Sequence, residues 1–269
     1  MGAPGLECLA RVTTGLDDGV ARARELLAQA RQIMVLTGAG VSAESGVPTF
    51  RGERGLWRSY RPEELATPEA FRRDPALVWE WYQWRRGLIA ECVPNPGHHA
   101  LARLALERGG VTLVTQNVDG LHHRAAREEA GRLGTKGPEG AFPLEVHGAI
   151  HRDRCSGCAR VTDAIPGNEP GPPRCIACGS PLRPDVVWFG ESLDPEVIGS
   201  AQQAALDADV CLVAGTSAVV YPAAGLPELT LRAGGAVVEV NPDATPLTSV
   251  ATVSLNGPSG EILPLIVGD

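Results

Sequence analysis

QIMVLTGAGVSA, residues 32–43, joins a short apolar run to a turn rich in glycine. The run Gln32–Leu36 has the length and composition of a strand that is buried on both faces of a parallel sheet. Gly38-Ala39-Gly40-Val41-Ser42-Ala43 matches the pattern G-x-G-x-x-A, in which glycines let backbone amides approach a pyrophosphate at the start of a helix. A tight turn with no ligand gives the same pattern. The region about 20 positions on holds Arg54–Arg61 and no strand, so a bound dinucleotide would not adopt the standard pose.

Further apolar runs predict the rest of the sheet. They are Val111–Thr115, Val186–Phe189, Asp209–Ala214, Ala236–Val240 and Val250–Leu255. Helical patterns lie between several of them, at Gly19–Arg31, Asn95–Glu107 and Pro195–Leu206. This alternation predicts an α/β fold with a Rossmann-like, doubly wound parallel sheet. Glycine, Asn, Asp or Ser follows four of the strands, which predicts one ligand crevice at the carboxyl ends of the sheet.

Two stretches interrupt the alternation of strands and helices. Residues 52–93 are mostly helical in pattern and rich in Trp, Arg and Tyr, and residues 151–184 are rich in Pro, Gly and Cys. We expect both to be insertions that together form a smaller domain. Residues 1–51, 94–150 and 185–269 would then form the discontinuous Rossmann-like domain. The segment Glu128–Phe142, rich in glycine and charge, predicts a surface loop.

Charge and composition exclude several classes of protein. The 269 residues carry 24 basic and 32 acidic side chains, for a formal net charge of −8. This balance disfavours nucleic-acid binding, which needs a surplus of Lys and Arg. No apolar run approaches the ~20 residues of a membrane span. The start of the chain lacks the pattern of a signal or import sequence, so a cytoplasmic protein is expected.

The cysteines predict a metal site. Cys155-x-x-Cys158 and Cys175-x-x-Cys178 have sixteen residues between the two pairs. Two such pairs form a tetrahedral zinc site of four thiolates, with no position left for water, so the zinc would be structural. The alternative, two redox disulfides, fits a cytoplasmic protein less well.

Several motifs together resemble the sirtuin family. Gly38-Ala39-Gly40-Val41-Ser42 leads into Pro48-Thr49-Phe50-Arg51, and Gln116-Asn117-Val118-Asp119 and His147-Gly148 follow in order before the paired cysteines. The resemblance runs from Ile33 to Pro264 and is strongest to class III, the desuccinylase and demalonylase type. It implies an NAD-dependent protein lysine deacylase that binds NAD and one structural zinc. Many other sirtuins have Asp where this chain has Thr49.

The resemblance also implies which residues bind the cofactor. Asn117 and Asp119 would hold the nicotinamide carboxamide, which suits their hydrogen-bonding groups. Family members often have Cys at the position of Ser259, so this contact is the least secure. The residues expected to contact NAD are Gly38, Ala39, Gly40, Ser42, Glu44, Thr49, Phe50, Arg51, Trp57, Gln116, Asn117, Asp119, Gly215, Thr216, Ser217, Asn241, Asp243 and Ser259.

His147 is the expected catalytic base. An imidazole with a pKa near ~6.5 accepts a proton at neutral pH. In the mechanism that the resemblance implies, it relays a proton from the ribose hydroxyls, and the products are free lysine, nicotinamide and O-acyl-ADP-ribose. A single histidine is usually structural, and only the family motif sets His147 apart from the other five histidines.

Tyr82 and Arg85 form the expected acyl-binding pair. Asp74-Pro75 predicts the start of a helix, because Asp caps helices and Pro suits the first turn. Residues three apart share a helical face, where a phenol and a guanidinium would grip a carboxylate. The resemblance to class III sirtuins implies that this pair reads succinyl, malonyl or glutaryl groups. The alternative is an aromatic-rich helix between domains with an ion-paired or solvated Arg85.

Val187-Trp188-Phe189-Gly190 resembles the strand that pairs with the substrate peptide in sirtuins, and a buried core strand is an equal alternative. Among enzymes, plain deacetylation or ADP-ribosyl transfer remains the second interpretation. A non-catalytic NAD or ADP-ribose sensor would need neither His147 nor the Tyr82/Arg85 pair. We expect acylated lysine peptides as partners, no nucleic acid, no membrane and a monomeric chain. The sequence does not rank the acyl groups.

Overall fold

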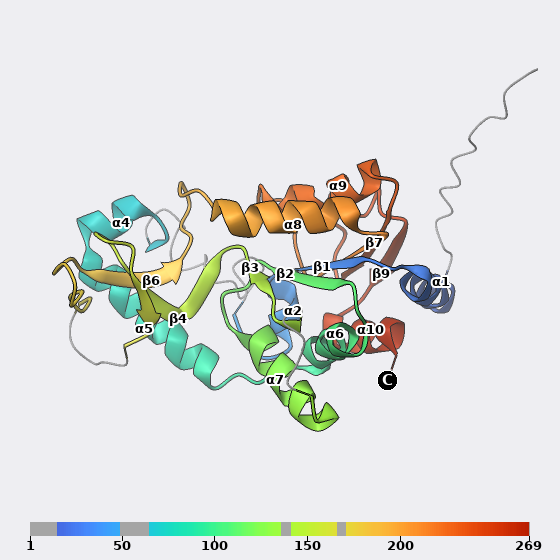
Figure 1. Cartoon of the computed structure of the whole chain (residues 1–269), viewed down its shortest axis with the longest axis horizontal. Coiled ribbons are helices and arrows are strands. Elements are labelled where there is room, and N and C mark those ends of the chain that lie inside the picture. The colour runs from blue at the N-terminus through green and yellow to red at the C-terminus, as the bar shows by residue number, and fades with distance from the viewer. Residues whose placement is uncertain (1–14, 49–64, 136–140, 166–170, 269) are drawn as a thin grey trace, which may run out of the picture.

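The computed structural model describes residues 15–48, 65–135, 141–165 and 171–268. A six-stranded parallel sheet lies at its centre (Figure 1). In spatial order the strands are β3 (Leu144–Glu145), β2 (Val111–Thr115), β1 (Ile33–Thr37), β7 (Val210–Ala214), β8 (Ala236–Asn241) and β9 (Val253–Asn256). All neighbouring pairs are parallel, which confirms the doubly wound sheet. The chain order reverses between β1 and β7, so the switch point lies at their carboxyl ends.

Helices cover both faces of this sheet (Figure 1). α8 (Pro195–Asp207) and α9 (Leu226–Arg232) lie on one face, and α1 (Leu16–Gln29), α6 (Pro96–Glu107), α7 (Leu121–Leu133) and α10 (Ser259–Val267) lie on the other. In β1, Met34 and Leu36 pack toward the first group, whereas Ile33 and Val35 pack toward the second. Every residue of β1 is buried, because both faces of the strand are covered.

Caps visible in the sequence start two of the predicted helices. Asn95 accepts hydrogen bonds from the amides of Gly97 and His98, and His98 completes a capping box at α6. Asp194 caps α8 in the same way, and a proline follows each cap at the first helical position. Both helices therefore start where the sequence predicted.

A second, antiparallel sheet lies beside the first, in the order β5 (Val161–Asp163), β4 (Gly148–Cys155) and β6 (Leu182–Val186). It packs near α4 (Pro68–Arg73) and α5 (Pro75–Ala90) at the left of Figure 1. The prediction that Val186–Phe189 is a strand of the parallel sheet is wrong. β6 ends at Val186 and pairs with β4, because a short apolar run fits either sheet and only the pairing partner decides.

The predicted surface loop Glu128–Phe142 is wrong in its first part. α7 continues to Leu133 and ends at Gly134, whose φ of 64° suits a glycine after a helix. Ion pairs within the helix, such as Arg124 with Glu128, offset the weak helix propensity of its glycine. The sequence was interpreted from composition alone, which does not detect such pairs.

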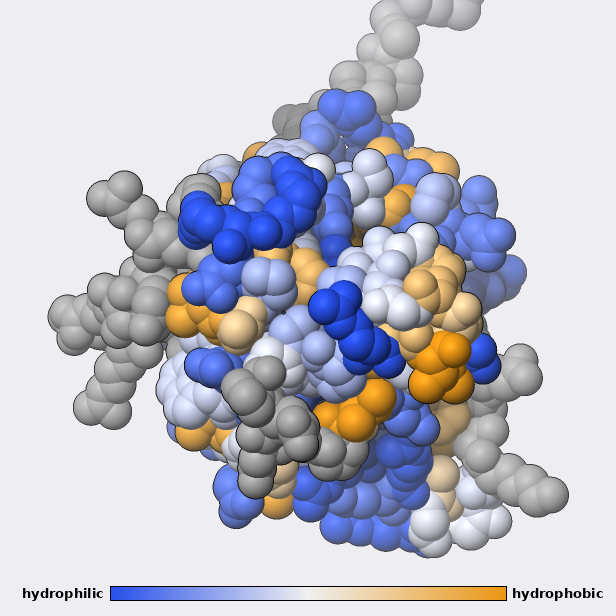
Figure 2. All heavy atoms as spheres, turned by 90° about the vertical axis from the view of Figure 1, so that its left-hand side faces the viewer, coloured by the Kyte–Doolittle hydropathy of each residue, from blue (hydrophilic) through white to orange (hydrophobic). Residues whose placement is uncertain are grey.

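Apolar residues are scattered among hydrophilic ones on the end of the molecule that carries the second sheet (Figure 2). Val161, Ile165 and Ile176 are exposed in this region. In the described ranges no helix combines the length and the apolar character that a membrane span requires.

Candidate functional site

The glycine turn after β1 lies directly against the turn after β7. Gly40 donates its amide to the Gly215 carbonyl at 2.7 Å, and Gly38 donates to the Ala214 carbonyl at 3.1 Å. A Cβ on Gly38 or Gly40 would come within 2.8 Å of Gly215 or its neighbour Thr216. Gly215 itself has a φ of 59°. These glycines permit close contact between two strand ends, and two of their amides are already used within the protein.

A polar cluster lies under this turn. Asn117 donates from its amide nitrogen to the Gly38 carbonyl at 3.0 Å and to the Ser42 hydroxyl oxygen at 3.2 Å. Ser42 in turn donates to the Asp119 carboxylate at 2.7 Å. Burial raises the pKa of Asp119, while hydrogen bonds from Leu121 and Ser42 and the charge of Arg85 oppose that rise. The cluster therefore joins the ends of β1 and β2 through a half-buried carboxyl group.

His147 lies between β3 and β4, within hydrogen-bonding distance of the loop that follows β2. Its Nδ1 is 3.1 Å from the Gln116 carbonyl oxygen, which can only accept, so Nδ1 carries the proton and Nε2 keeps a free lone pair. Burial lowers the pKa of His147 below its usual 6.5, partly opposed by this hydrogen bond. The ring is consequently neutral at pH 7 with a basic nitrogen available.

Two further histidines lie beneath the cluster. His98 accepts from the Asn95 amide through Nδ1, so its Nε2 donates to Ser42 at 3.3 Å. Burial lowers the pKa of His98 to about 3 and that of His122 well below 6.5. His122 bonds the hydroxyl of Thr37, and the two rings lie 4.8 Å apart. Both rings are neutral and fix the orientation of the residues above them.

The remaining strand ends carry polar residues around the same edge. Gln116 donates to the Thr216 hydroxyl oxygen at 3.0 Å, which links the ends of β2 and β7. Asn241 at the end of β8 donates to the Asp243 carbonyl at 2.7 Å. Ser217 follows Thr216 in the turn after β7. The structure thus brings the four predicted strand-end groups to one edge of the sheet.

Glu44 and Ser259 meet at the start of α10. A Glu44 carboxylate oxygen accepts the Gly260 amide at 2.6 Å, so this side chain anchors the helix. The Ser259 hydroxyl is buried and has no hydrogen-bond partner within the described residues. The predicted cofactor residues Thr49, Phe50, Arg51 and Trp57 lie outside the part of the chain that the structure describes.

Tyr82 and Arg85 lie on one face of α5, as predicted. The Asp74 carboxylate caps this helix by accepting the Leu77 amide at 3.0 Å. Both side chains are buried, with exposed fractions of 1% for Tyr82 and 4% for Arg85. Burial lowers the pKa of Arg85, while the Trp81 ring, whose centroid lies 4.8 Å from the guanidinium, attracts the cation. Burial raises the pKa of Tyr82, so the phenol keeps its proton at neutral pH.

The segment after β6 connects the base to the helices. Val187 donates its amide to the His147 carbonyl at 3.0 Å, and Phe189 donates to the Ala66 carbonyl at 2.9 Å. Trp188 is buried in the cluster that contains Tyr82, while the Phe189 side chain is 47% exposed. Gly190 is exposed and has a φ of 87°. The segment therefore presents one apolar side chain outward and one inward.

The four predicted metal ligands lie together. The sulfur atoms of Cys155, Cys158, Cys175 and Cys178 are all within 4.8 Å of one another. Cys155 and Cys178 sulfurs are 3.3 Å apart, far beyond the ~2.05 Å of a disulfide bond. This cluster fits one tetrahedral zinc ion and excludes the disulfide alternative in this structure. Gly148, next to His147, and Cys155 occupy opposite ends of β4, so the cysteine cluster lies away from His147.

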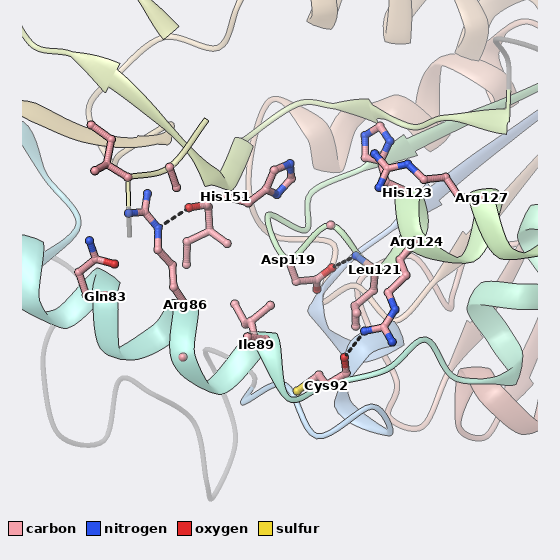
Figure 3. Close-up of a pocket in the computed structure, with 16 residues that line it drawn as sticks. Gln83, Arg86, Ile89, Cys92, Asp119, Leu121, His123, Arg124, Arg127 and His151 are labelled. Atoms are coloured by element: carbon pink, nitrogen blue, oxygen red, sulfur yellow. Dashed lines mark hydrogen bonds between the residues drawn. The ribbon is translucent and has the colours of Figure 1, made fainter. Parts of the chain in front are cut away.

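A cavity of about 670 Å³ opens between α5 and α7 on the other side of Asp119 (Figure 3). Its wall includes Arg86, which is paired with Asp153, and Arg124, which donates to the Cys92 carbonyl. Both arginines have partners within the protein, but Nη1 of Arg86 has none among the described residues. The cavity shares Asp119 with the polar cluster but includes neither His147 nor the Tyr82/Arg85 pair.

The chain belongs to the Sir2 family, whose model matches residues 38–222. It is 51% identical over 245 residues to NAD-dependent protein deacylase 2 of Pyrobaculum aerophilum, covering 90% of this chain and 92% of that protein. It is 48% identical over 244 residues to NAD-dependent protein deacylase 1 of Archaeoglobus fulgidus, covering 90% and 94%. A solved Sir2 homolog–NAD complex is 44% identical, with a TM-score of 0.82 and coverage of 95% and 93%.

Sequence reasoning missed several residues that shape this site. It set His98 aside with the other histidines, interpreted His122 as a capping or packing residue, and gave no role to Thr37, whose hydroxyl donates to Thr115 between β1 and β2. It also overlooked Arg86, which ties α5 to β4. A polar residue at the last position of a buried strand, as in Thr37 and Thr115, was the available signal.

Proposed function

We propose that this chain is an NAD-dependent protein-lysine deacylase. The single observation that supports it most is the hydrogen bond between His147 and the Gln116 carbonyl, next to Asn117. It holds a neutral imidazole with a free nitrogen at the end of β2, where the neighbouring Asn117 bonds the glycine turn. The relatives named as NAD-dependent protein deacylases, and the similar structure solved with NAD, support the same cofactor and reaction.

NAD, when bound, supplies the ribose carbon that takes the acyl oxygen as nicotinamide leaves. In our proposal the turn at Gly38–Gly40 accommodates the phosphates, and Asn117 and Asp119 hold the nicotinamide amide. Ser42 fixes both of these side chains through its hydroxyl. Thr216, Ser217 and Asn241 complete the edge of the sheet on the adenosine side.

His147 acts as the general base in this proposal. Its Nε2 takes a proton from a ribose hydroxyl, and the Gln116 carbonyl stabilises the protonated ring by accepting from Nδ1. Because burial lowers the pKa of His147, the base is unprotonated at neutral pH. Activity should therefore fall only when the pH drops through this lowered pKa, since a protonated ring cannot accept.

We further propose that the favoured acyl groups end in a carboxylate, such as succinyl, malonyl or glutaryl. Arg85 supplies a buried cation and Tyr82 a protonated phenol on the same face of α5. A carboxylate bound there would gain about 1.5–3 kcal/mol over an uncharged group from one charge-assisted hydrogen bond. The peptide main chain would run along Val187–Gly190, next to His147.

The zinc cluster has a structural role in this proposal, since four cysteine thiolates leave no open position for a water molecule. We propose that residues 52–93 and 151–184 together form the small domain, and that the remaining segments form the NAD-binding domain. Hydrogen bonds from Arg86 to the Arg152 carbonyl and the Asp153 carboxylate join the two insertions.

The test is turnover of matched acetyl-lysine and succinyl-lysine peptides with and without NAD. We expect NAD-dependent release of nicotinamide with both peptides and a higher kcat/KM for succinyl-lysine. Arg85→Met should lower the succinyl-to-acetyl ratio of kcat/KM at least about tenfold, and Arg72→Met, an exposed arginine on α4, should leave that ratio as it is. Equal loss with both peptides would reject the acyl pocket. NAD binding without turnover would favour the sensor interpretation.

A further inference from the structure

The Tyr82 hydroxyl has a defined hydrogen-bond direction. The Trp188 indole nitrogen lies 2.9 Å from the Tyr82 oxygen. An indole N–H can only donate, so the phenol oxygen accepts and its own proton is directed elsewhere. Among the described residues, none accepts that proton. The phenol therefore presents a donor on the side facing away from Trp188.

Trp188 is held from its backbone side by an ion pair. Its amide donates to the Glu191 carboxylate at 2.8 Å. Arg183 binds the same carboxylate through both terminal nitrogens, at 2.5 and 2.9 Å, and also donates to the Val186 carbonyl. A bidentate pair of this kind fixes orientation as well as distance. The backbone of Trp188 is consequently fixed at the end of β6.

The indole ring contacts a guanidinium and a second aromatic ring. The Arg183 guanidinium carbon lies 3.3 Å from the ring centroid, and the Phe71 ring lies 5.4 Å away at an interplanar angle of 46°. Trp188 is only 2% exposed. Rotation of the ring would break these contacts together with the bond to Tyr82. The direction of the indole N–H is therefore set by packing, before any ligand binds.

We propose that Trp188 is a positioning residue for acyl selectivity, which directs the Tyr82 proton toward the carboxylate of the acyl group. This inference rests on the proposed function and assigns to Trp188 the task of orienting the hydroxyl. A neutral acetyl group has no carboxylate to accept that proton, so the effect is confined to acidic acyl groups. Trp188 acts through Tyr82 without needing to touch the carboxylate.

Double-mutant kinetics separate this role from simple packing. Trp188→Phe removes the indole N–H and keeps an aromatic ring, and it should lower the succinyl-to-acetyl ratio of kcat/KM about tenfold. Tyr82→Phe should lower the ratio by a similar factor. The double variant should show no further loss, because both changes remove the same interaction.

Two outcomes would overturn the positioning role. One is a loss of both activities in equal proportion in Trp188→Phe, which indicates packing alone. The other is independent, multiplying losses in the double variant. Trp84→Phe, on the exposed face of α5, is the matched control and should keep the parent ratio.

An NMR measurement tests the hydrogen bond without relying on activity. The chain has five tryptophans, so the indole N–H signal that disappears in Trp188→Phe can be assigned to Trp188. That signal should move in Tyr82→Phe, a variant that also serves if Trp188→Phe fails to fold. An unmoved signal overturns the positioning role alone. A parent enzyme with no preference for succinyl-lysine overturns the acyl class of the proposed function, while the indole shift still reports on the bond.

Discussion

The two sheets of this molecule are stabilised by different means. The parallel sheet is buried on both faces by helices, and its two core clusters contain apolar residues from β1, β2, β7 and β8. The cluster around the metal-ligand cysteines contains only Cys155, Cys175 and Leu182, while Ile150 of β4 packs into the cluster of α4 and α5. The antiparallel sheet also holds two buried carboxylates, Asp153 and Asp185, each paired with arginine.

The difference indicates what offsets the conformational entropy that each region loses on folding. The larger sheet buries enough apolar area to be stable by the hydrophobic effect, whereas three short strands with a small core need another source of stability. A metal ion and buried ion pairs supply it. His147, the base in our proposal, lies at the junction of the two, between β3 of one sheet and β4 of the other. Changes in the small sheet can therefore reach the site through β4.

Loss of the metal should have the largest effect on the difference in stability between the two sheets. Cys175→Ser removes one of four ligands, and a structural zinc contributes on the order of 10 kcal/mol to the folding of small zinc domains. We expect loss of bound zinc, measured by mass spectrometry. We also expect rapid hydrogen exchange in β4, β5 and β6, with protection retained in β1 and β7. The control is Cys211→Ser, which changes a buried cysteine of the large sheet and should leave the zinc bound. Normal melting and exchange in Cys175→Ser would contradict a structural metal.

Removal of the base at the junction should have the next largest effect. His147→Tyr should lower turnover of both acyl peptides by about 10²- to 10⁴-fold, the usual contribution of a general base. The melting temperature should stay close to that of the parent, because the side chain is only partly buried. Steady-state kinetics and calorimetry measure the two effects. Retained turnover would remove His147 from the mechanism.

Loss of the buried ion pair between Arg86 of α5 and Asp153 of β4 should have the third largest effect. Arg86→Met leaves the Asp153 carboxylate, which is 0% exposed, without its cation, and such a change costs about 3–5 kcal/mol. Arg154→Met is the matched control, since that arginine is 44% exposed and Asp185 keeps a second partner, Arg152. Its cost should be at most about 1 kcal/mol. Urea unfolding measures both, and equal losses would show that burial does not govern these pairs.

The smallest effect concerns the buried histidine of the large region. The pKa of His98 is about 3 in the folded chain and near 6.5 when unfolded, so between these values only the unfolded state binds the proton. The free energy of unfolding should fall by about 1.4 kcal/mol for each pH unit below 6.5 from this group. His98→Gln keeps the capping box and should reduce the slope by that amount in urea titrations from pH 6 to 4. If the free energy of unfolding had the same slope against pH in the parent and in His98→Gln, a buried neutral His98 would be contradicted.

The sequence predicted the parallel sheet well because its signals are local. Gln32–Leu36 and Asp209–Ala214 are apolar without alternation, as strands covered on both faces must be, and a glycine or polar residue ends each one. The zinc cluster was equally accessible, since thiolate spacing is written in the chain. The prediction that Val186–Phe189 is a strand of the parallel sheet was wrong because an apolar run does not reveal its pairing partner. The prediction of a surface loop at Glu128–Phe142 was wrong in its first part because ion pairs within a helix outweighed the composition of the segment.

The sequence by itself determined the class of fold, the metal ligands and the set of polar residues at the ends of the strands. These depend on periodicity and spacing, which short segments carry without help from the rest of the chain. The tertiary structure alone decided that Nε2 of His147 is the free nitrogen, that His98 is neutral and that Trp188 directs the Tyr82 hydroxyl. Tautomers, pKa values and hydrogen-bond directions depend on neighbours that are distant in sequence, and only folding brings those neighbours together.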